Sequence, residues 1–186
     1  ALEVHCLVVF QFLLFVFTRL NPLRFLKRFA PVMMCAFTTA TSNGTIPLSI
    51  GTLDKKIGVS KKISSFTIPL GATINMDGTS IMQGVAVIFI AQVYGMELTP
   101  PQLLTVIATA MIASIGTAGI PSVGLIMLAM VLTSVGLPTE GIALIMGIDR
   151  ILDMLRTAVN ITGDAVCTTI VSSQNKELDR SIFNRD

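Results

Sequence analysis

Apolar runs that are almost long enough to cross a bilayer constrain this chain more than any other feature of its sequence. The runs 7–17, 81–93, 103–115 and 125–135 contain almost only apolar residues. They approach the roughly 20 residues that a spanning helix needs, although several are short or interrupted. With 52% hydrophobic and 13% charged residues, the chain is more apolar than a soluble domain of 186 residues requires. The sequence therefore predicts an all-α integral membrane protein.

The beginning of the chain is typical of part of a longer protein. The first residue is Ala1, and no basic segment followed by a cleavage site precedes the first apolar run. We therefore predict no signal peptide and expect a fragment.

The basic residues indicate which loops share a side of the membrane. Eleven of the thirteen Lys and Arg residues fall in three clusters, whereas the segments 96–101 and 136–140 contain none. By the positive-inside rule, the clusters face the cytoplasm and these two segments face outward. The clusters are Arg19, Arg24, Lys27 and Arg28; Lys55, Lys56, Lys61 and Lys62; and Lys176, Arg180 and Arg185.

A re-entrant hairpin is predicted for the segment 29–54, which begins and ends beside basic clusters. About 26 residues cannot cross a bilayer twice, because two crossings take roughly 40. The stretch 38–49 is rich in hydroxyl groups, Gly and Pro, so it is predicted to form a helix-break-helix tip. Non-helical backbone at membrane depth is tolerated only against protein or a watery cavity. The tip is therefore predicted to line an internal site.

A second hairpin is predicted to enter from the outer side. The segment 100–136 starts and ends without basic residues and is interrupted at 114–124. Its length barely permits two crossings, so two ordinary helices joined by a Gly-Pro turn are the alternative. Between the hairpins, 63–95 crosses once and is interrupted at 71–80. Opposed hairpins beside interrupted helices are typical of an inverted-repeat transporter, although small residues also favour close helix packing by themselves.

Polar residues form one stripe along the predicted helix 149–164. At about 100° per residue, six polar side chains fall within an arc of roughly 100°, and the rest of the helix is almost wholly apolar. Charges at membrane depth cost about 2.5 to 3.5 kcal/mol each, so they pair with one another or contact a ligand. Pairing of Asp153 with Arg156 or Arg150 is the simpler interpretation. The stripe consists of Asp149, Asp153, Arg156, Thr157, Asn160 and Asp164.

Pairing alone does not account for the polar residues predicted at the same depth in other segments. The interrupted helix places Asp77 beside Asn75 and Thr79, and both hairpin tips carry hydroxyl groups. Carboxylate, amide and carbonyl oxygens suit a small hard cation such as Na⁺, while Arg156 offers a planar fork for a carboxylate. The sequence therefore predicts a binding site for a charged organic solute and cations.

The single histidine and the three cysteines are far apart in the sequence. His5 is predicted to lie at the membrane interface rather than to act as a ligand. Cys6, Cys35 and Cys167 are predicted to be small packing residues, with neither a metal site nor a disulfide framework.

Three motifs resemble one known family of transporters. NMDGT (75–79), SIGTAGIP (114–121) and DMLRTAVNITGD (153–164) occur in the order seen in the dicarboxylate/amino acid:cation symporter family, the glutamate transporter homologues. The resemblance covers nearly the whole chain and implies a truncated, glutamate-transporter-like transport domain with transmembrane helices and two opposed re-entrant hairpins. The implied parts are a last scaffold-side helix and cytoplasmic loop (1–28), hairpin 1 and a basic loop (29–62), the interrupted helix (63–96), hairpin 2 (97–136), an amphipathic transmembrane helix (137–175) and a cytoplasmic tail (176–186).

The resemblance also implies which residues contact the substrate. Arg156, assisted by Thr79, would hold the side-chain carboxylate of an amino acid, and Asp153 would receive its amino group. The further substrate contacts implied are Thr157, Asn160, Ser42 in the first tip, and Ile120 and Gly124 in the second.

Sodium sites are implied by the same resemblance. The first would combine carbonyl groups of Gly71, Asn75 and Asn160 with the Asp164 carboxylate. The third would use Asp77 and Asn75 with an earlier helix that is absent from this chain. The second would use backbone oxygens of Thr73, Ser114, Ile115 and Thr117.

The expected activity is symport of L-aspartate or L-glutamate with Na⁺, with H⁺ coupling left open, by elevator-type alternating access. Because Asp153 and Arg156 occur together, an acidic amino acid is favoured over the alternatives of cystine or a C4-dicarboxylate. The first tip departs from the family pattern at Thr41 and Asn43, and Ala40 and Met154 replace a second arginine, for which Arg150 is a candidate substitute. These departures leave the selectivity open.

The resemblance further implies a homotrimer in a bacterial-type plasma membrane, with no nucleic-acid partner and no enzymatic activity. The truncated chain is not expected to transport by itself. An intramembrane aspartyl protease with Asp77 and Asp164 as its dyad is the enzymatic alternative, but it gives Arg156 no purpose and lacks the GxGD context. A channel-like or purely structural segment is the other alternative.

Overall fold

The computed structural model describes residues 1–115 and 122–185, and every element in these ranges is helical apart from an isolated β-bridge between Val59 and Leu178. The predicted all-α class is confirmed for these residues. The longer helices are α2 (Phe10–Thr18), α3 (Pro22–Thr39), α4 (Ser42–Thr52), α5 (Lys61–Ile74), α6 (Asp77–Val93), α7 (Pro100–Ile115), α8 (Val123–Ser134) and α10 (Asp149–Gln174). The shorter elements are α1 (Leu2–Val4), η1 (His5–Val9), η2 (Leu53–Ile57), η3 (Thr139–Ile142), α9 (Ala143–Met146) and α11 (Arg180–Asn184).

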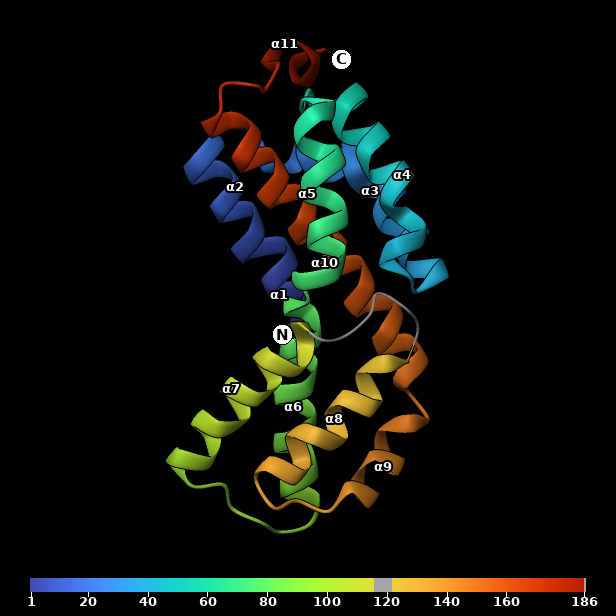
Figure 1. The fold of residues 1–186 in the computed structure, drawn as a ribbon, viewed down its shortest axis with the longest axis vertical. Helices are drawn as coiled ribbons and strands as arrows, with labels where there is room; N and C mark the ends of the chain where they lie inside the picture. The colour runs from blue at the N-terminus through green and yellow to red at the C-terminus, as the bar shows by residue number, and fades with distance from the viewer. Residues whose placement is uncertain (116–121, 186) are drawn as a thin grey trace.

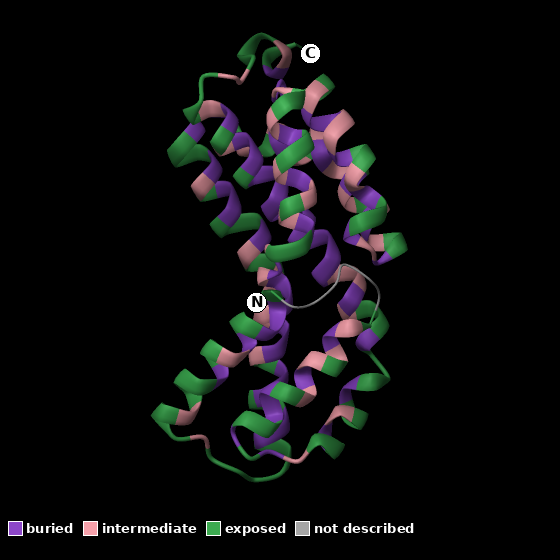
Figure 2. Cartoon of the chain, viewed as in Figure 1, coloured by how far each residue is buried: buried purple, intermediate pink, exposed green. Residues whose placement is uncertain are grey.

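Two apolar cores occupy the two halves of an elongated molecule (Figure 1). One core joins α2, α3 and α10 around Phe25 and Phe29, and the other joins α6, α7 and α8 around Ile90 and Leu128. Large apolar side chains are also exposed on the outer faces, as for Phe66, and Figure 2 shows buried residues on the inner faces of the helices. Exposed apolar side chains on the outer faces suit contact with lipid tails, which are themselves apolar.

The first predicted hairpin is formed by α3 and α4, which pack against each other. The α3 helix ends at Thr39, and its C-cap Ala40 has a left-handed φ of 51°. The Thr41 hydroxyl caps α4 by accepting the N–H of Gly44 at 3.4 Å. The break is therefore shorter than predicted, because α4 is helical from Ser42 onward in spite of Pro47. A capping threonine supplies the helix start that the tip's composition did not suggest.

The second predicted hairpin is formed by α7 and α8, which also contact each other. These helices have 16 and 12 residues, fewer than the roughly 20 that a crossing needs. The choice between a re-entrant hairpin and two ordinary spanning helices stays a prediction. Figure 1 shows that this pair opens toward the opposite end of the molecule from α3 and α4. The depth of either hairpin in a membrane stays a prediction.

The predicted interruption between α5 and α6 is confirmed. Asn75 and Met76 leave the helical region, with φ and ψ of −92° and 82° and of −116° and 45°. Among the described residues, the run 61–93 formed by these two helices is the one stretch long and apolar enough to cross a membrane by length and composition. Shorter apolar helices cover 2–18, 100–115 and 123–134.

The three basic clusters converge at one end of the molecule, as the predicted topology requires. Arg28 donates from Nη1 to the carbonyls of Lys56 at 2.5 Å and Ile182 at 3.1 Å, which ties the three clusters together. At this end, the N-cap of α11 is Asp179, and the Ser181 hydroxyl and backbone N–H lower the pKa of that carboxyl group by donating to it. The side of the membrane that this end faces stays a prediction.

Candidate functional site

The polar stripe of α10 lies inside the protein. All six stripe residues are buried, and none is more than 5% exposed. Arg150, which lies off the stripe, is exposed. The predicted periodicity is therefore confirmed, and the buried position of the stripe explains how charged residues fit a helix in so apolar a chain.

Arg156 and Asp153 form a buried ion pair on adjacent turns of α10, with Nη2 of the arginine donating to Oδ1 of the carboxylate. The other carboxylate oxygen, Oδ2, accepts the backbone N–H of Ser122 at 2.9 Å, just before α8 begins. Nη1 of Arg156 lies 3.5 Å from the Sδ atom of Met82 on α6. A methyl group added at Gly124 would overlap this guanidinium group. Residues of α6, α8 and α10 thus enclose one cation and one anion that pair with each other.

Asn160 joins α10 to the beginning of α6. Its Oδ1 atom accepts the backbone N–H of Gly78 at 2.8 Å. Its Nδ2 atom lies 3.3 Å from the Thr79 hydroxyl and 3.1 Å from the sulfur of Met76. Nearby, the Thr157 hydroxyl donates to the backbone carbonyl of Asp153 at 2.8 Å. The broken helix is therefore held directly against the stripe, and the predicted residues Thr79 and Asn160 lie together.

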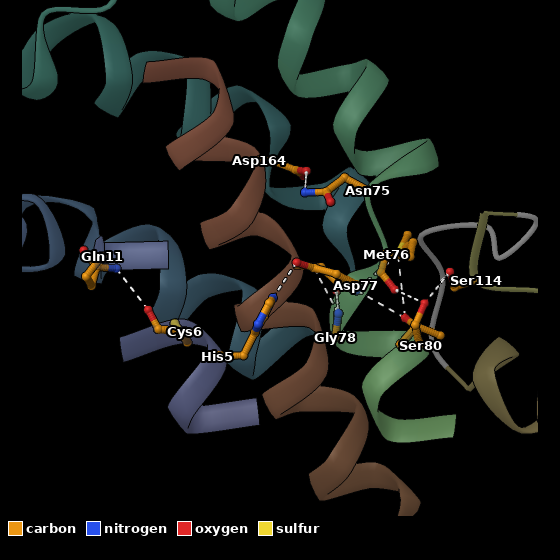
Figure 3. Close-up of polar contacts among 12 residues, drawn as sticks. His5, Cys6, Gln11, Asn75, Met76, Asp77, Gly78, Ser80, Ser114 and Asp164 are labelled. Atoms are coloured by element: carbon orange, nitrogen blue, oxygen red, sulfur yellow. Dashed lines mark hydrogen bonds and ion pairs between the residues drawn. The ribbon is translucent and has the colours of Figure 1, made fainter. Parts of the chain in front are cut away.

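A second polar cluster surrounds the predicted first sodium site (Figure 3). Asn75 donates from Nδ2 to Oδ1 of Asp164 at 2.9 Å. The carbonyl of Gly71 accepts the N–H of Asn75 at 2.8 Å, and a methyl group added at Gly71 would overlap the Asp164 carboxylate. A carboxylate, a side-chain amide and a backbone carbonyl therefore meet at the helix break.

Asp77 lies beside this cluster and contacts the N-terminal helical segment. Its Oδ2 atom is 2.8 Å from Nε2 of His5, and its Oδ1 atom accepts the N–H of Gly78 at 2.9 Å (Figure 3). The His5 ring is partly buried against Asp77 and packs edge-on against Phe10, and its predicted position at the membrane interface stays a prediction. An N-terminal segment of this chain therefore contacts the acid that the family resemblance places in a third sodium site.

The donor groups fit a hard monovalent cation better than a transition metal. Within 1–115 and 122–185, no three His, Cys, Asp or Glu side chains gather as metal ligands. Cys6 is buried, Cys35 is half-buried and Cys167 is exposed, and all three are free thiols. Oxygen atoms of one carboxylate, one amide and backbone carbonyls suit Na⁺, whereas soft metals select sulfur and imidazole.

Sequence comparison identifies the family of this chain. The model of the sodium:dicarboxylate symporter family matches residues 1–174. This chain belongs to the sodium:dicarboxylate symporter family. The resemblance inferred from the three motifs is thereby confirmed.

Similar members of the sodium:dicarboxylate symporter family are animal transporters. Excitatory amino acid transporter 2 of Homo sapiens is 44% identical over 179 residues, which are 96% of this chain and 31% of that protein. Excitatory amino acid transporter 3 of Mus musculus is 43% identical over 176 residues, which are 95% of this chain and 34% of that protein. The excitatory amino acid transporter of Caenorhabditis elegans is 42% identical over 175 residues, covering 94% and 35%. This chain thus spans about a third of the length of these family members.

The remaining predicted residues lie at the tips and breaks. Ser42 is buried at the start of α4, which contacts α10. Ser114, near the end of α7, is buried and accepts a hydrogen bond from the Ser80 hydroxyl at 2.7 Å. Thr73 and Ile115 are exposed at the ends of α5 and α7, which contact each other. The predictions for Thr117 and Ile120 lie outside the described residues.

Several contact residues were not found from the sequence. The sulfur atoms of Met76 and Met82 and the backbone N–H of Ser122 all touch stripe residues. Methionines are common in apolar helices and a backbone group has no sequence signature, so neither gave a signal. Gln83 is fully buried on α6, and neither amide atom has a hydrogen-bond partner in the part of the chain that the structure describes. The sequence signal for Gln83 was an amide side chain within an apolar run.

The close approach of Gly71 to Asp164 gives a test of the cation cluster. In a full-length family member that contains this chain, Gly71→Ala should lower the Na⁺ affinity by about tenfold. The added methyl group overpacks the cluster, and overpacking costs about 1–3 kcal/mol. Gly51→Ala is the matched control, since a methyl group there meets nothing within 4 Å. Sodium titrations of substrate binding measure both. Equal sodium affinity in the two variants contradicts the assignment of Gly71.

Proposed function

We propose that this chain is the transport-domain part of a sodium-coupled symporter of acidic amino acids, L-aspartate or L-glutamate. The observation that carries the proposal is the buried pair of Asp153 and Arg156 between α6, α8 and α10. Each member is the complement of one end of the substrate: a carboxylate for the ammonium group and a planar guanidinium for the side-chain carboxylate. Substrate binding would exchange the internal pair for two ligand pairs.

The neighbouring predicted residues complete this proposed binding site. Thr79 and Asn160 lie in contact beside the pair and offer a hydroxyl and an amide to a bound carboxylate. Thr157 shares the buried face, and Ser42 and Gly124 sit at the starts of α4 and α8, respectively. Asp153 distinguishes this proposal from a C4-dicarboxylate symporter, because a substrate without an ammonium group leaves that acid unpaired.

Sodium is the proposed co-transported ion. Asp164, Asn75 and the carbonyl of Gly71 form the cluster that would hold one Na⁺, and Asp77 would contribute to another. Thr79 lies just after the same helix break and contacts the substrate cluster. The proposed ion and substrate therefore both bind to the backbone segment between α5 and α6. Linkage requires that each then raises the affinity of the other by the same factor.

The proposed movement is of the elevator type. The helices α3, α4, α5 and α6 contact α10, and Ser122 and Gly124 at the start of α8 approach Asp153 and Arg156 on it. The two hairpins, the broken helix and α10 would move together against the rest of a longer, homotrimeric protein. The proposal keeps the predicted parts of the transport domain, which end at residues 28, 62, 96, 136 and 175. It also places the protein in a bacterial-type plasma membrane, with several membrane crossings and with both hairpin tips at membrane depth.

The proposal is tested by calorimetry on the purified full-length transporter. We expect L-aspartate to bind in NaCl and to bind far more weakly in choline chloride at equal ionic strength. A pH series in each salt separates sodium coupling from proton coupling. Affinity that is independent of both Na⁺ and pH contradicts symport, and conduction without binding indicates the channel alternative.

Gly124 supplies a prediction for the substrate cluster. Gly124→Ala should lower L-aspartate affinity by about tenfold or more, because its methyl group overlaps the guanidinium of Arg156 and displaces it. Gly84→Ala is the matched helical control, since nothing lies within 4 Å of its added methyl group. Competition binding with labelled L-aspartate compares the two variants. Similar affinities in both would show that the guanidinium position is unimportant.

A further inference from the structure

The basic end of the molecule keeps a large positive charge. The segments 19–28, 54–62 and 176–185 meet there and contain eleven basic and three acidic residues, which gives a net charge of +8. The rest of the chain has the opposite sign, since the net charge of all 186 residues is +2. Neither the substrate cluster nor the cation cluster described above includes a residue of these three segments.

Two arginines at this end bind backbone carbonyls. Arg28 donates to the carbonyls described above, and Arg180 donates from Nη2 to the carbonyl of Thr18 at 2.8 Å. Among the three acids, Asp179 accepts hydrogen bonds from the backbone N–H and the hydroxyl of Ser181. A carbonyl satisfies a guanidinium donor without cancelling its charge. The hydrogen bonds that hold this end together therefore leave its positive field in place.

Helices α2 and α5 each place an exposed apolar side chain one turn from an exposed basic one at this end. Both helices contact α10, and Figure 1 shows all three reaching the end of the molecule that carries the C-terminus. On α2, Phe15 is 47% exposed, and the guanidinium carbon of the exposed Arg19 lies 5.9 Å from the centre of its ring. On α5, Phe66 is 68% exposed and follows the exposed Lys62 by four residues. In both pairs the basic residue is the one nearer the end.

Helix α10, which lies between these two, shows the same order of side chains. Val171 in its last turn is exposed, and the exposed Lys176 follows just beyond the end of the helix at Gln174. We call the three exposed cations Arg19, Lys62 and Lys176 the basic rim. Apolar side chains toward the middle of a molecule, with Lys and Arg beyond them, are the arrangement that suits a membrane interface, where the cations reach the head groups.

We propose that the basic rim is a docking surface for anionic phospholipids of the cytoplasmic leaflet. The head groups pair with the rim, and the acyl chains pack on Phe15 and Phe66. This inference rests on the proposed function, which places this end at the cytoplasmic face of a membrane. Charge complementarity selects an anionic head group, because a zwitterionic one brings a positive charge of its own. The exposed aromatic rings select a lipid over a free phosphate ion, which has no acyl chain to cover them.

The test measures binding of labelled phosphatidylglycerol and phosphatidylcholine, with identical acyl chains, to the purified full-length transporter in detergent micelles. Each Lys or Arg near an anionic surface contributes roughly fivefold in affinity. The triple variant Arg19→Gln, Lys62→Gln and Lys176→Gln should therefore lower phosphatidylglycerol affinity by about tenfold to a hundredfold and leave phosphatidylcholine affinity unchanged. The matched control keeps the charges through Arg19→Lys, Lys62→Arg and Lys176→Arg. Added choline chloride should weaken phosphatidylglycerol binding to the parent protein, because salt screens exposed charges.

Several outcomes would overturn the docking surface. Equal affinity for the two lipids in the parent protein is one, and a preference for phosphatidylglycerol that survives in the glutamine variant is another, since the lipid then binds elsewhere. Displacement of the lipid by an equal concentration of inorganic phosphate would show a phosphate site without an acyl-chain contact. L-aspartate binding in NaCl, measured on the same preparations, separates this inference from the proposed function. Na⁺-dependent L-aspartate binding without a lipid preference overturns the docking surface alone, and a lipid preference without that binding overturns the proposed function alone.

Discussion

Arg156→Cys in the full-length transporter should lower L-aspartate affinity by at least about a hundredfold and create measurable binding of neutral amino acids. Removing one member of a buried charge pair costs about 2–5 kcal/mol, and each 1.4 kcal/mol is a tenfold change. The guanidinium is the proposed receptor of the side-chain carboxylate, so its loss penalises an acidic side chain. A small, uncharged side chain fits the space that the arginine leaves between Met82 and Gly124.

Uptake of labelled L-aspartate and L-serine by reconstituted vesicles with a sodium gradient measures this change of preference. Arg156→Lys is the control for charge, and it should recover only part of the L-aspartate affinity because a lysine cannot form the planar fork. Thermal unfolding of each variant separates lost binding from lost folding. Unchanged L-aspartate uptake in a stable Arg156→Cys protein refutes the role given to Arg156.

Sequence periodicity predicted the α10 stripe correctly because one helix places its own residues. The pairing of Asp153 with Arg156 is a contact between neighbouring turns, and spacing limited the candidates to Arg156 and Arg150, of which the structure shows Arg156. The break at Asn75 and Met76 was equally local. These parts of the site depend on residues that are close in the sequence, which is why they could be predicted without coordinates.

The contacts that sequence reasoning missed are long-range. His5 and Asp77 are 72 positions apart, and their contact depends on how the N-terminal helical segment packs beside the broken helix. The contact between Ser122 and Asp153 depends on where α8 begins relative to α10. Asp149 was predicted to lie on the stripe, but only its surroundings show that its Oδ1 atom has no hydrogen-bond partner among the described residues. Packing geometry, rather than residue type, decides each of these cases.

Asp153→Asn should abolish L-aspartate binding while it preserves or strengthens binding of succinate, which has the same two carboxylates and no ammonium group. The amide cannot neutralise an ammonium group, so an amino acid loses its charged partner at a cost of about 2–5 kcal/mol. The substitution also releases Arg156 from its internal ion pair, which leaves the guanidinium free for a carboxylate ligand.

These opposite effects on two ligands make the outcome independent of protein stability. A misfolded variant binds neither compound, whereas the proposed role predicts that L-aspartate is lost and succinate is gained in the same sample. Isothermal titration of both ligands in NaCl measures the two affinities. Normal L-aspartate affinity in Asp153→Asn would show that the ammonium group is held elsewhere. Parallel loss of both ligands by a folded protein would show that Asp153 acts by positioning Arg156, since the guanidinium needs this carboxylate and the Ser122 N–H that anchors it to stay in place.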